Sequence, residues 1–231
     1  MRPYLTVLKA GQAEQTIERS RFIGSVIPAK TARECEDFFA RVRKEHRQAT
    51  HNVPAYVLGE TGALQWAGDD GEPRGTSGAP IVFMLVQEGI SDVAIVVTRY
   101  FGGVKLGRGG LVRAYTGTAK LALAAAGMGE VSEKLVLEIE TDYTGYHNLE
   151  AASGDLFTIK DARFAEAVKA TVVCEPIARE EALRRIMAAG PQARLVSEQT
   201  ETVTTPCPGF YAGQSGDGSS SVRRTNVSGT E

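Results

Sequence analysis

The hydrophobic residues recur along the chain with two different spacings, which together predict a mixture of strands and helices. Alternating or uninterrupted β-branched runs indicate strands, whereas apolar residues three or four positions apart indicate helices. In the first 128 residues this pattern predicts strands over 16–29, 51–59, 63–67 and 93–99, and helices over 32–47, 80–86 and 111–126. Beyond Gly129 it predicts strand, helix, strand, strand, helix and strand over 132–143, 146–152, 156–162, 165–175, 179–189 and 193–203.

Local signals divide this pattern into parts. Thr31 followed by Glu34 forms a capping box at the start of the first helix. Gly127 and Gly129 end a helix where a new pattern starts, so we expect domains over 1–128 and 130–203. The order β-α-β-β-α-β in the second domain is that of the ferredoxin-like fold. Residues 204–231 are rich in Gly and Ser, which predicts a flexible tail.

The segment from Asp92 to Tyr115 is predicted to be a buried strand, a glycine-rich loop and a helix start. It contains cations and glycines but no acid after Asp92, so we predict an anion or nucleic-acid site. The candidate residues of this site are Arg99, Lys105, Gly107, Arg108, Gly109, Gly110 and Arg113. The alternative is that the glycines only permit tight packing while the basic side chains are solvated. Tyr100 and Phe101 could stack on bases, but packing in the core is favoured for both.

Two nucleotide-binding motifs are disfavoured at this loop. Gly102 and Gly107 have phosphate-loop spacing, but Arg108 and Gly109 occupy the positions of the required Lys and Ser/Thr. The dinucleotide pattern also fails, because Val112 stands where its last glycine belongs. No cofactor is therefore expected.

A polar, turn-rich loop over 69–80 is the second candidate region, because such loops between core elements often carry function. Its candidate functional residues are Asp70, Glu72, Arg74, Thr76 and Ser77. Its acidic side chains could bind a hard cation, but they lack the calcium-loop spacing, and pairing with nearby Arg side chains is favoured. Thr76 and Ser77 are the expected caps of the following helix. No metal site is predicted.

Charge and cysteine content narrow the function classes. The net charge is −2, yet residues 1–129 hold 16 Lys/Arg against 12 Asp/Glu, while residues 130–203 hold 8 against 14. The first domain is thus the better candidate for a polyanionic partner. The three cysteines are odd in number and contain no C-x-x-C pair, which is typical of reduced thiols. Without an apolar run long enough to span a bilayer, we expect a cytoplasmic location and no membrane partner.

The motifs DDGEPRGTSGAP and VVTRYFGGVKLGRGGLVRAY, together with SRFIGSVIPA and HNVPAYVLG, resemble the IMPACT/YigZ family. The resemblance covers about residues 1–128 and, more weakly, the second domain. It implies a first domain like domain 2 of ribosomal protein S5, a two-layer α/β fold, and a ferredoxin-like second domain like one in elongation factor G. Eukaryotic relatives restrain a stress-activated kinase of translation initiation by occupying its activator. Many members have Cys where this chain has Val53, so a Cys–His nucleophile with His51 is unavailable.

These observations favour a non-enzymatic protein that associates with RNA or the ribosome and regulates translation. No catalytic residue is predicted, since the three histidines form no evident triad, and we expect His51 to make a structural hydrogen bond. One alternative is an enzyme for a small phosphorylated or carboxylated metabolite, with Asp70 and Glu72 as acid/base groups or metal ligands. Another is an adaptor that binds a translation-related protein.

Overall fold

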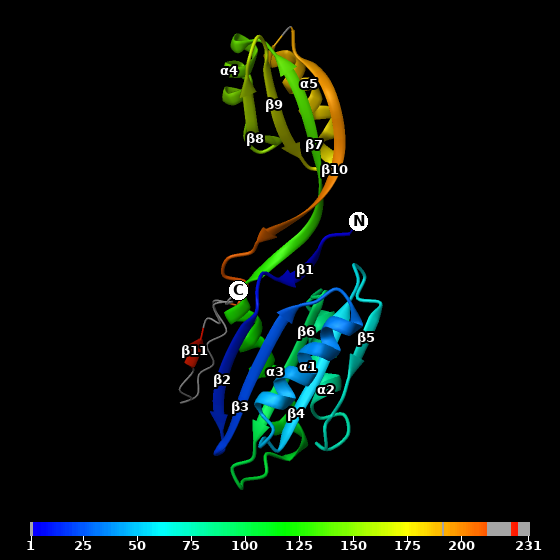
Figure 1. The fold of residues 1–231 in the computed structure, drawn as a ribbon, viewed down its shortest axis with the longest axis vertical. Coiled ribbons are helices and arrows are strands. Elements are labelled where there is room, and N and C mark those ends of the chain that lie inside the picture. The colour runs from blue at the N-terminus through cyan, green and yellow to red at the C-terminus, as the bar shows by residue number, and fades with distance from the viewer. Residues whose placement is uncertain (1, 191, 212–222, 226–231) are drawn as a thin grey trace. The chain divides into compact units, whose positions relative to one another are not determined.

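The structure is a computed structural model that describes residues 2–190, 192–211 and 223–225 (Figure 1). It divides into two compact units, one comprising Arg2–Val131 with Thr204–Glu231 and the other Ser132–Val203. Both units combine sheets and helices, so the fold class is α+β, as the hydrophobic pattern predicts. Among the described residues, no helix is long and apolar enough to cross a bilayer.

The first unit is built on an antiparallel sheet with the strand order β11-β2-β3-β6-β4-β5 (Figure 1). Its strands are β2 (Gly11–Ile17), β3 (Ser20–Pro28), β4 (His51–Leu58), β5 (Leu64–Ala67), β6 (Val93–Tyr100) and β11 (Arg223–Thr225). The helices of this unit are α1 (Ala32–Glu45), α2 (Gly78–Gln87) and α3 (Gly107–Ala126). A separate strand, β1 (Tyr4–Val7), pairs with the start of β7 (Met128–Thr141).

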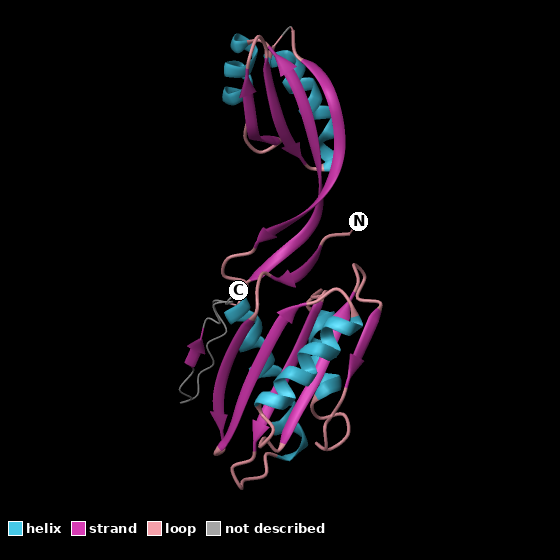
Figure 2. Ribbon diagram, in the orientation of Figure 1, coloured by secondary structure: helices cyan, strands magenta, loops and turns pink. Residues whose placement is uncertain are grey.

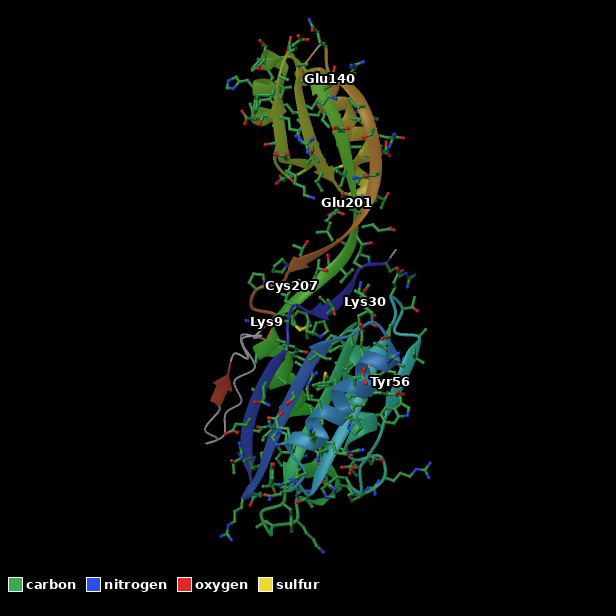
Figure 3. The ribbon with its side chains drawn as sticks, viewed as in Figure 1. Lys9, Lys30, Tyr56, Glu140, Glu201 and Cys207 are labelled. Carbon is green, nitrogen blue, oxygen red and sulfur yellow. The ribbon has the colours of Figure 1, made fainter. Side chains whose placement is uncertain are left out.

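Helices cover both faces of this sheet, and each face has its own core (Figure 2). Alternate residues of β6 point to opposite faces: Ile95 packs with α2 and α3, whereas Val96 packs with α1. Tyr56, labelled in Figure 3, lies on the α1 face and stacks with Phe39 and Trp66. Because β6 is central and covered on both sides, even its polar residues Thr98 and Arg99 are buried.

The second unit has the element order β7, α4, β8, β9, α5 and β10, with a short 3-10 helix over Pro176–Ala178 before α5. Its further elements are α4 (Tyr143–Ala152), β8 (Phe157–Phe164), β9 (Val168–Cys174), α5 (Arg179–Ala189) and β10 (Arg194–Pro206). β7 pairs with β9 and β10, and β9 pairs with β8. Leu149 of α4 and Ile186 of α5 pack in one core with Leu137 of the sheet, so both helices cover the same face.

The structure corrects three boundaries. The stretch 16–29 is not one strand, because Glu18 and Arg19 both adopt positive φ and form a tight turn between β2 and β3. The glycines from Gly107 to Gly110 form the first turn of α3 rather than a loop. The prediction of a flexible tail is wrong for 204–211, where β10 ends and Tyr211 is buried. Residues 212–222 and 226–231 of that predicted tail lie outside the described residues.

Candidate functional site

The two candidate regions meet at the end of the sheet where β6 finishes. Arg99, near the end of β6, pairs in register with His51 at the start of β4 and with Phe22 of β3. The loop after β6 runs past the turn between β2 and β3, since a Cβ on Gly102 would stand 2.0 Å from the Arg19 carbonyl oxygen. The polar loop over 69–80, which we call the acidic loop, reaches the glycine-rich segment where Arg108 donates to the Arg74 carbonyl. The two segments are parts of one surface, at the lower end of this unit in Figure 1.

Arg99 is not an exposed phosphate ligand, contrary to the sequence prediction. Arg99 is only 4% exposed, and its guanidinium donates a hydrogen bond of 2.7 Å to the Glu72 carboxylate. A second contact of 3.3 Å joins the same guanidinium to the Ser20 hydroxyl. The cause is the position of Arg99 on a central strand between two helical layers. Arg99 therefore acts inside the unit, as the partner of a buried carboxylate.

Glu72 joins the acidic loop to three other elements. The same oxygen that accepts from Arg99 accepts a hydrogen bond from the Tyr115 hydroxyl of α3 at 2.7 Å, and His51 Nε2 lies 3.6 Å away. Burial and the hydrogen bond to Glu72 raise the pKa of Tyr115 well above its ordinary value. Glu72 is buried and its Oε1 already accepts from Arg99 and Tyr115. The geometry therefore does not favour Glu72 as a general base or metal ligand.

Asp69 shapes the rest of the acidic loop. Its carboxylate accepts hydrogen bonds from the backbone N–H groups of Gly75 at 2.9 Å and Gly78 at 3.1 Å, and from the Ser77 hydroxyl at 2.7 Å. Burial alone would raise the pKa of Asp69, but these hydrogen bonds outweigh it and lower the pKa. Asp69 thus caps α2, which is the role predicted for Thr76 and Ser77. The Thr76 hydroxyl instead donates to the Pro73 carbonyl, and the Ser77 hydroxyl donates to the Asp69 carboxylate.

Asp70 holds the loop against β4. Its carboxylate accepts from the Asn52 N–H at 2.6 Å and lies 3.4 Å from Arg43, while its carbonyl is 2.8 Å from His51 Nδ1. The expected structural hydrogen bond of His51 is therefore present, as is the predicted pairing of the loop acids with Arg side chains. Within the described ranges, no group of three or more His, Cys, Asp or Glu is placed to hold a metal ion.

The remaining predicted cations form an exposed set that we call the basic end. Lys105, Arg108 and Arg113 are exposed, and across the described part of the chain none of them has a carboxylate partner. Arg108 donates to the backbone carbonyl of Arg74 at 3.2 Å. Arg74, which belongs to the acidic loop, is also exposed and is the fourth cation of this set. The basic end comprises Arg74, Lys105, Arg108 and Arg113.

The start of α3 adds to the positive potential of the basic end. The helix begins at Gly107 after Leu106, with no side-chain cap and no acidic residue in its first turn. The first N–H groups of a helix lack partners within the helix, and the helix dipole places partial positive charge there. Three of the first four residues of this turn, Gly107, Gly109 and Gly110, have no side chain. A bound anion can therefore approach the backbone N–H groups at this point.

The two aromatic residues after Arg99 differ from each other. Tyr100 is half-buried, and its hydroxyl lies 3.0 Å from His46 Nδ1. Phe101 is 45% exposed, so the prediction that it packs in the core is wrong. The β-branched pattern of the strand ends before this position, and the chain leaves the covered part of the sheet here.

Sequence reasoning missed two residues that organise this surface. Ser20 is buried, and its hydroxyl accepts from the Gly102 N–H at 3.2 Å as well as contacting Arg99. Tyr115 is also fully buried, although the sequence suggested only that it resumes a helical pattern. No spacing rule links either residue to Glu72 or Arg99. The one available signal was the charge of Arg99 on an otherwise apolar strand, which requires a buried partner.

Comparison with known proteins gives matches over most of the chain. The model of the Impact N-terminal domain matches residues 18–123. The chain is 40% identical over 167 residues to IMPACT family member YvyE of Bacillus subtilis (strain 168), covering 72% of this chain and 77% of that protein. It is 40% identical over 111 residues to IMPACT family member YigZ of Escherichia coli (strain K12), covering 47% and 54%.

Among solved structures, the chain is similar to one titled "Crystal structure of an hypothetical protein". The two share 27% sequence identity with a TM-score of 0.54, and the similarity covers 85% of this chain and 98% of that one. This title assigns no activity. The similarity therefore supports the fold without adding chemistry.

Proposed function

Since the chain belongs to the IMPACT family, we propose that it is a non-enzymatic RNA- or ribosome-associated protein that regulates translation. The observation that carries the proposal is the basic end. Exposed cations without carboxylate partners among the described residues surround an uncapped helix start. Such a surface favours a polyanion, because phosphates bind both to cationic side chains and to free backbone N–H groups.

The proposal divides the predicted residues between two roles. Lys105, Arg108 and Arg113 contact phosphates, together with Arg74 and the first turn of α3. Arg99 and Glu72 instead hold the acidic loop and α3 in place around that surface. The metabolite enzyme is less well supported, because its acid/base candidate Glu72 is buried against Arg99 and Tyr115.

At the level of the fold, we propose that the first unit is S5 domain 2-like and the second ferredoxin-like. The second proposal is supported by the order β7, α4, β8, β9, α5, β10 and by the packing of both helices on one face. Both folds occur in the translation machinery, which is the resemblance that links the chain to translation. The fold itself implies no chemistry.

Fluorescence anisotropy with labelled RNA tests the proposed function. A variant with Lys105, Arg108 and Arg113 replaced by Ala should bind RNA at least about tenfold more weakly, because three phosphate contacts are lost. The matched control replaces three exposed cations of the other unit by Ala, namely Arg163, Arg184 and Arg185, for the same change in net charge. Equal weakening in both variants, or no binding by the unmodified protein, would overturn the proposal.

A further inference from the structure

Phe101 is a large apolar side chain exposed at the basic end. The residue is 45% exposed, and in the chain it lies between the end of β6 and the segment that carries Lys105 and Arg108. Exposed single hydrophobic residues are common and need no special explanation. Phe101 differs in two respects, which are the rigidity of its backbone and the charge around it.

The backbone at Phe101 is held by two hydrogen bonds and by the close packing of the next residue. The Phe101 N–H donates to the Thr50 hydroxyl at 3.0 Å, and the next N–H, of Gly102, donates to the Ser20 hydroxyl at 3.2 Å. Only glycine fits at 102, since a Cβ there would stand 2.0 Å from the Arg19 carbonyl oxygen. The backbone that carries the Phe101 ring is therefore held in place, and little backbone entropy is lost when a ligand binds the ring.

The ring is also supported from within the unit. The guanidinium carbon of Arg99 lies 5.2 Å from the centroid of the Phe101 ring and 5.3 Å from that of Phe22, so the guanidinium is close to both rings. This is within the range of a cation–π contact. Because Arg99 is itself held by Glu72, the buried pair fixes the position of an exposed aromatic surface.

An exposed ring on a held backbone, in the segment that leads to the exposed cations Lys105 and Arg108, suits one class of ligand. Aromatic side chains stack on nucleobases of any sequence, while nearby cations contact the backbone phosphates. In a duplex the base faces are stacked on one another, so only an unpaired nucleotide can offer a face to the ring. We propose that Phe101 is the base-stacking platform of the basic end and that its ligand is single-stranded RNA. This inference rests on the proposed function and adds the class of RNA.

Anisotropy with a labelled uridine oligomer and a labelled RNA duplex of equal length tests the inference. Phe101→Ala should weaken binding of the single strand about 5- to 150-fold, the range measured for base stacking on aromatic residues. Phe101→Tyr keeps the stacking face and should bind like the unmodified protein. The matched control is Phe83→Ala, which removes another exposed phenylalanine, 67% exposed on α2. If Phe101→Ala melts early, Phe101→Leu provides the same comparison.

The outcomes separate this inference from the proposed function. Preference for the single strand, lost in Phe101→Ala and retained in Phe101→Tyr, supports the stacking platform. Tight binding of the single strand that is unaffected by Phe101→Ala would overturn the stacking platform and leave the proposed function intact. Equal binding of the duplex would overturn the preference for unpaired bases. Absence of all RNA binding in the unmodified protein would overturn both proposals.

Discussion

The buried pair of Arg99 and Glu72 gives the sharpest prediction for stability. Replacing Glu72 by Gln keeps the size of the side chain and an oxygen that can accept from Arg99 and Tyr115, but it removes the negative charge. The side chains of Arg99 and Glu72 are 5% and 3% exposed, so water cannot replace the lost charge. Leaving one member of a buried ion pair without its partner costs about 3 to 5 kcal/mol.

For a chain of this size, about 1 kcal/mol shifts the melting temperature by about 2 to 4 °C, so Glu72→Gln should lower it by about 6 to 20 °C. Thermal melting followed by circular dichroism, with urea unfolding at 25 °C, measures the effect. Glu36→Gln is the matched control: this carboxylate is exposed on α1, and its replacement should change stability by less than about 0.5 kcal/mol.

A double variant separates the buried charge from other causes. Adding Arg99→Met to Glu72→Gln removes both charges, and an apolar side chain of similar length can fill the space. The double variant should recover most of the lost stability, because the penalty comes from the unpaired charge. The structural role assigned to this pair is wrong if Glu72→Gln melts within about 2 °C of the unmodified protein. It is also wrong if the stability lost in the double variant equals the sum of the losses in Glu72→Gln and Arg99→Met alone.

Three further predictions concern packing, thiol reactivity and pH. Gly102→Ala should destabilise by about 1 to 3 kcal/mol because its Cβ meets backbone, whereas Gly109→Ala, in open helix, should not. Cys207, half-buried and labelled in Figure 3, should react with a thiol reagent before Cys35, whose pKa burial raises to about 11. The lowered pKa of Asp69 means that its advantage over Asp69→Asn is full above about pH 5 and shrinks as the pH falls further.

Each of these predictions can fail in a defined way. Urea unfolding that finds the two alanine variants equally stable would contradict the close packing of Gly102. Mass spectrometry of the labelled native protein that finds Cys35 modified first would contradict its burial. A difference between unmodified protein and Asp69→Asn that grows as the pH falls from 5 to 3 would contradict the hydrogen bonds assigned to that carboxylate.

Local signals in the sequence predicted much of the fold. The capping box of Thr31 and Glu34 is present in full, and the apolar run of β6 is buried on both faces. The turn between β2 and β3 was missed, because Glu18 and Arg19 adopt a left-handed backbone that usually calls for Gly or Asn. In the folded unit the Arg19 carbonyl lies close to Gly102, a contact that no local pattern indicates.

The candidate site was predicted in part, for a physical reason. Residue type and spacing located the cations, but they do not tell which cations are buried. Arg99 belongs to an apolar strand and pairs with Glu72, 27 positions away, whereas Lys105 and Arg108 follow it in the chain and are exposed. The partner of a buried charge is fixed by tertiary packing, which no local pattern encodes. For the same reason, no pattern in the sequence indicates that Ser20 and Tyr115 complete the cluster.

The salt dependence of RNA binding tests the central claim most directly, because its slope counts phosphate contacts. For single strands, the logarithm of the binding constant falls with the logarithm of the salt concentration by about 0.7 per contacted phosphate. The variant with Lys105, Arg108 and Arg113 replaced by Ala should therefore have a slope about two units shallower than the unmodified protein. Identical slopes in the two proteins would show that the basic end does not contact phosphates, and would contradict the account.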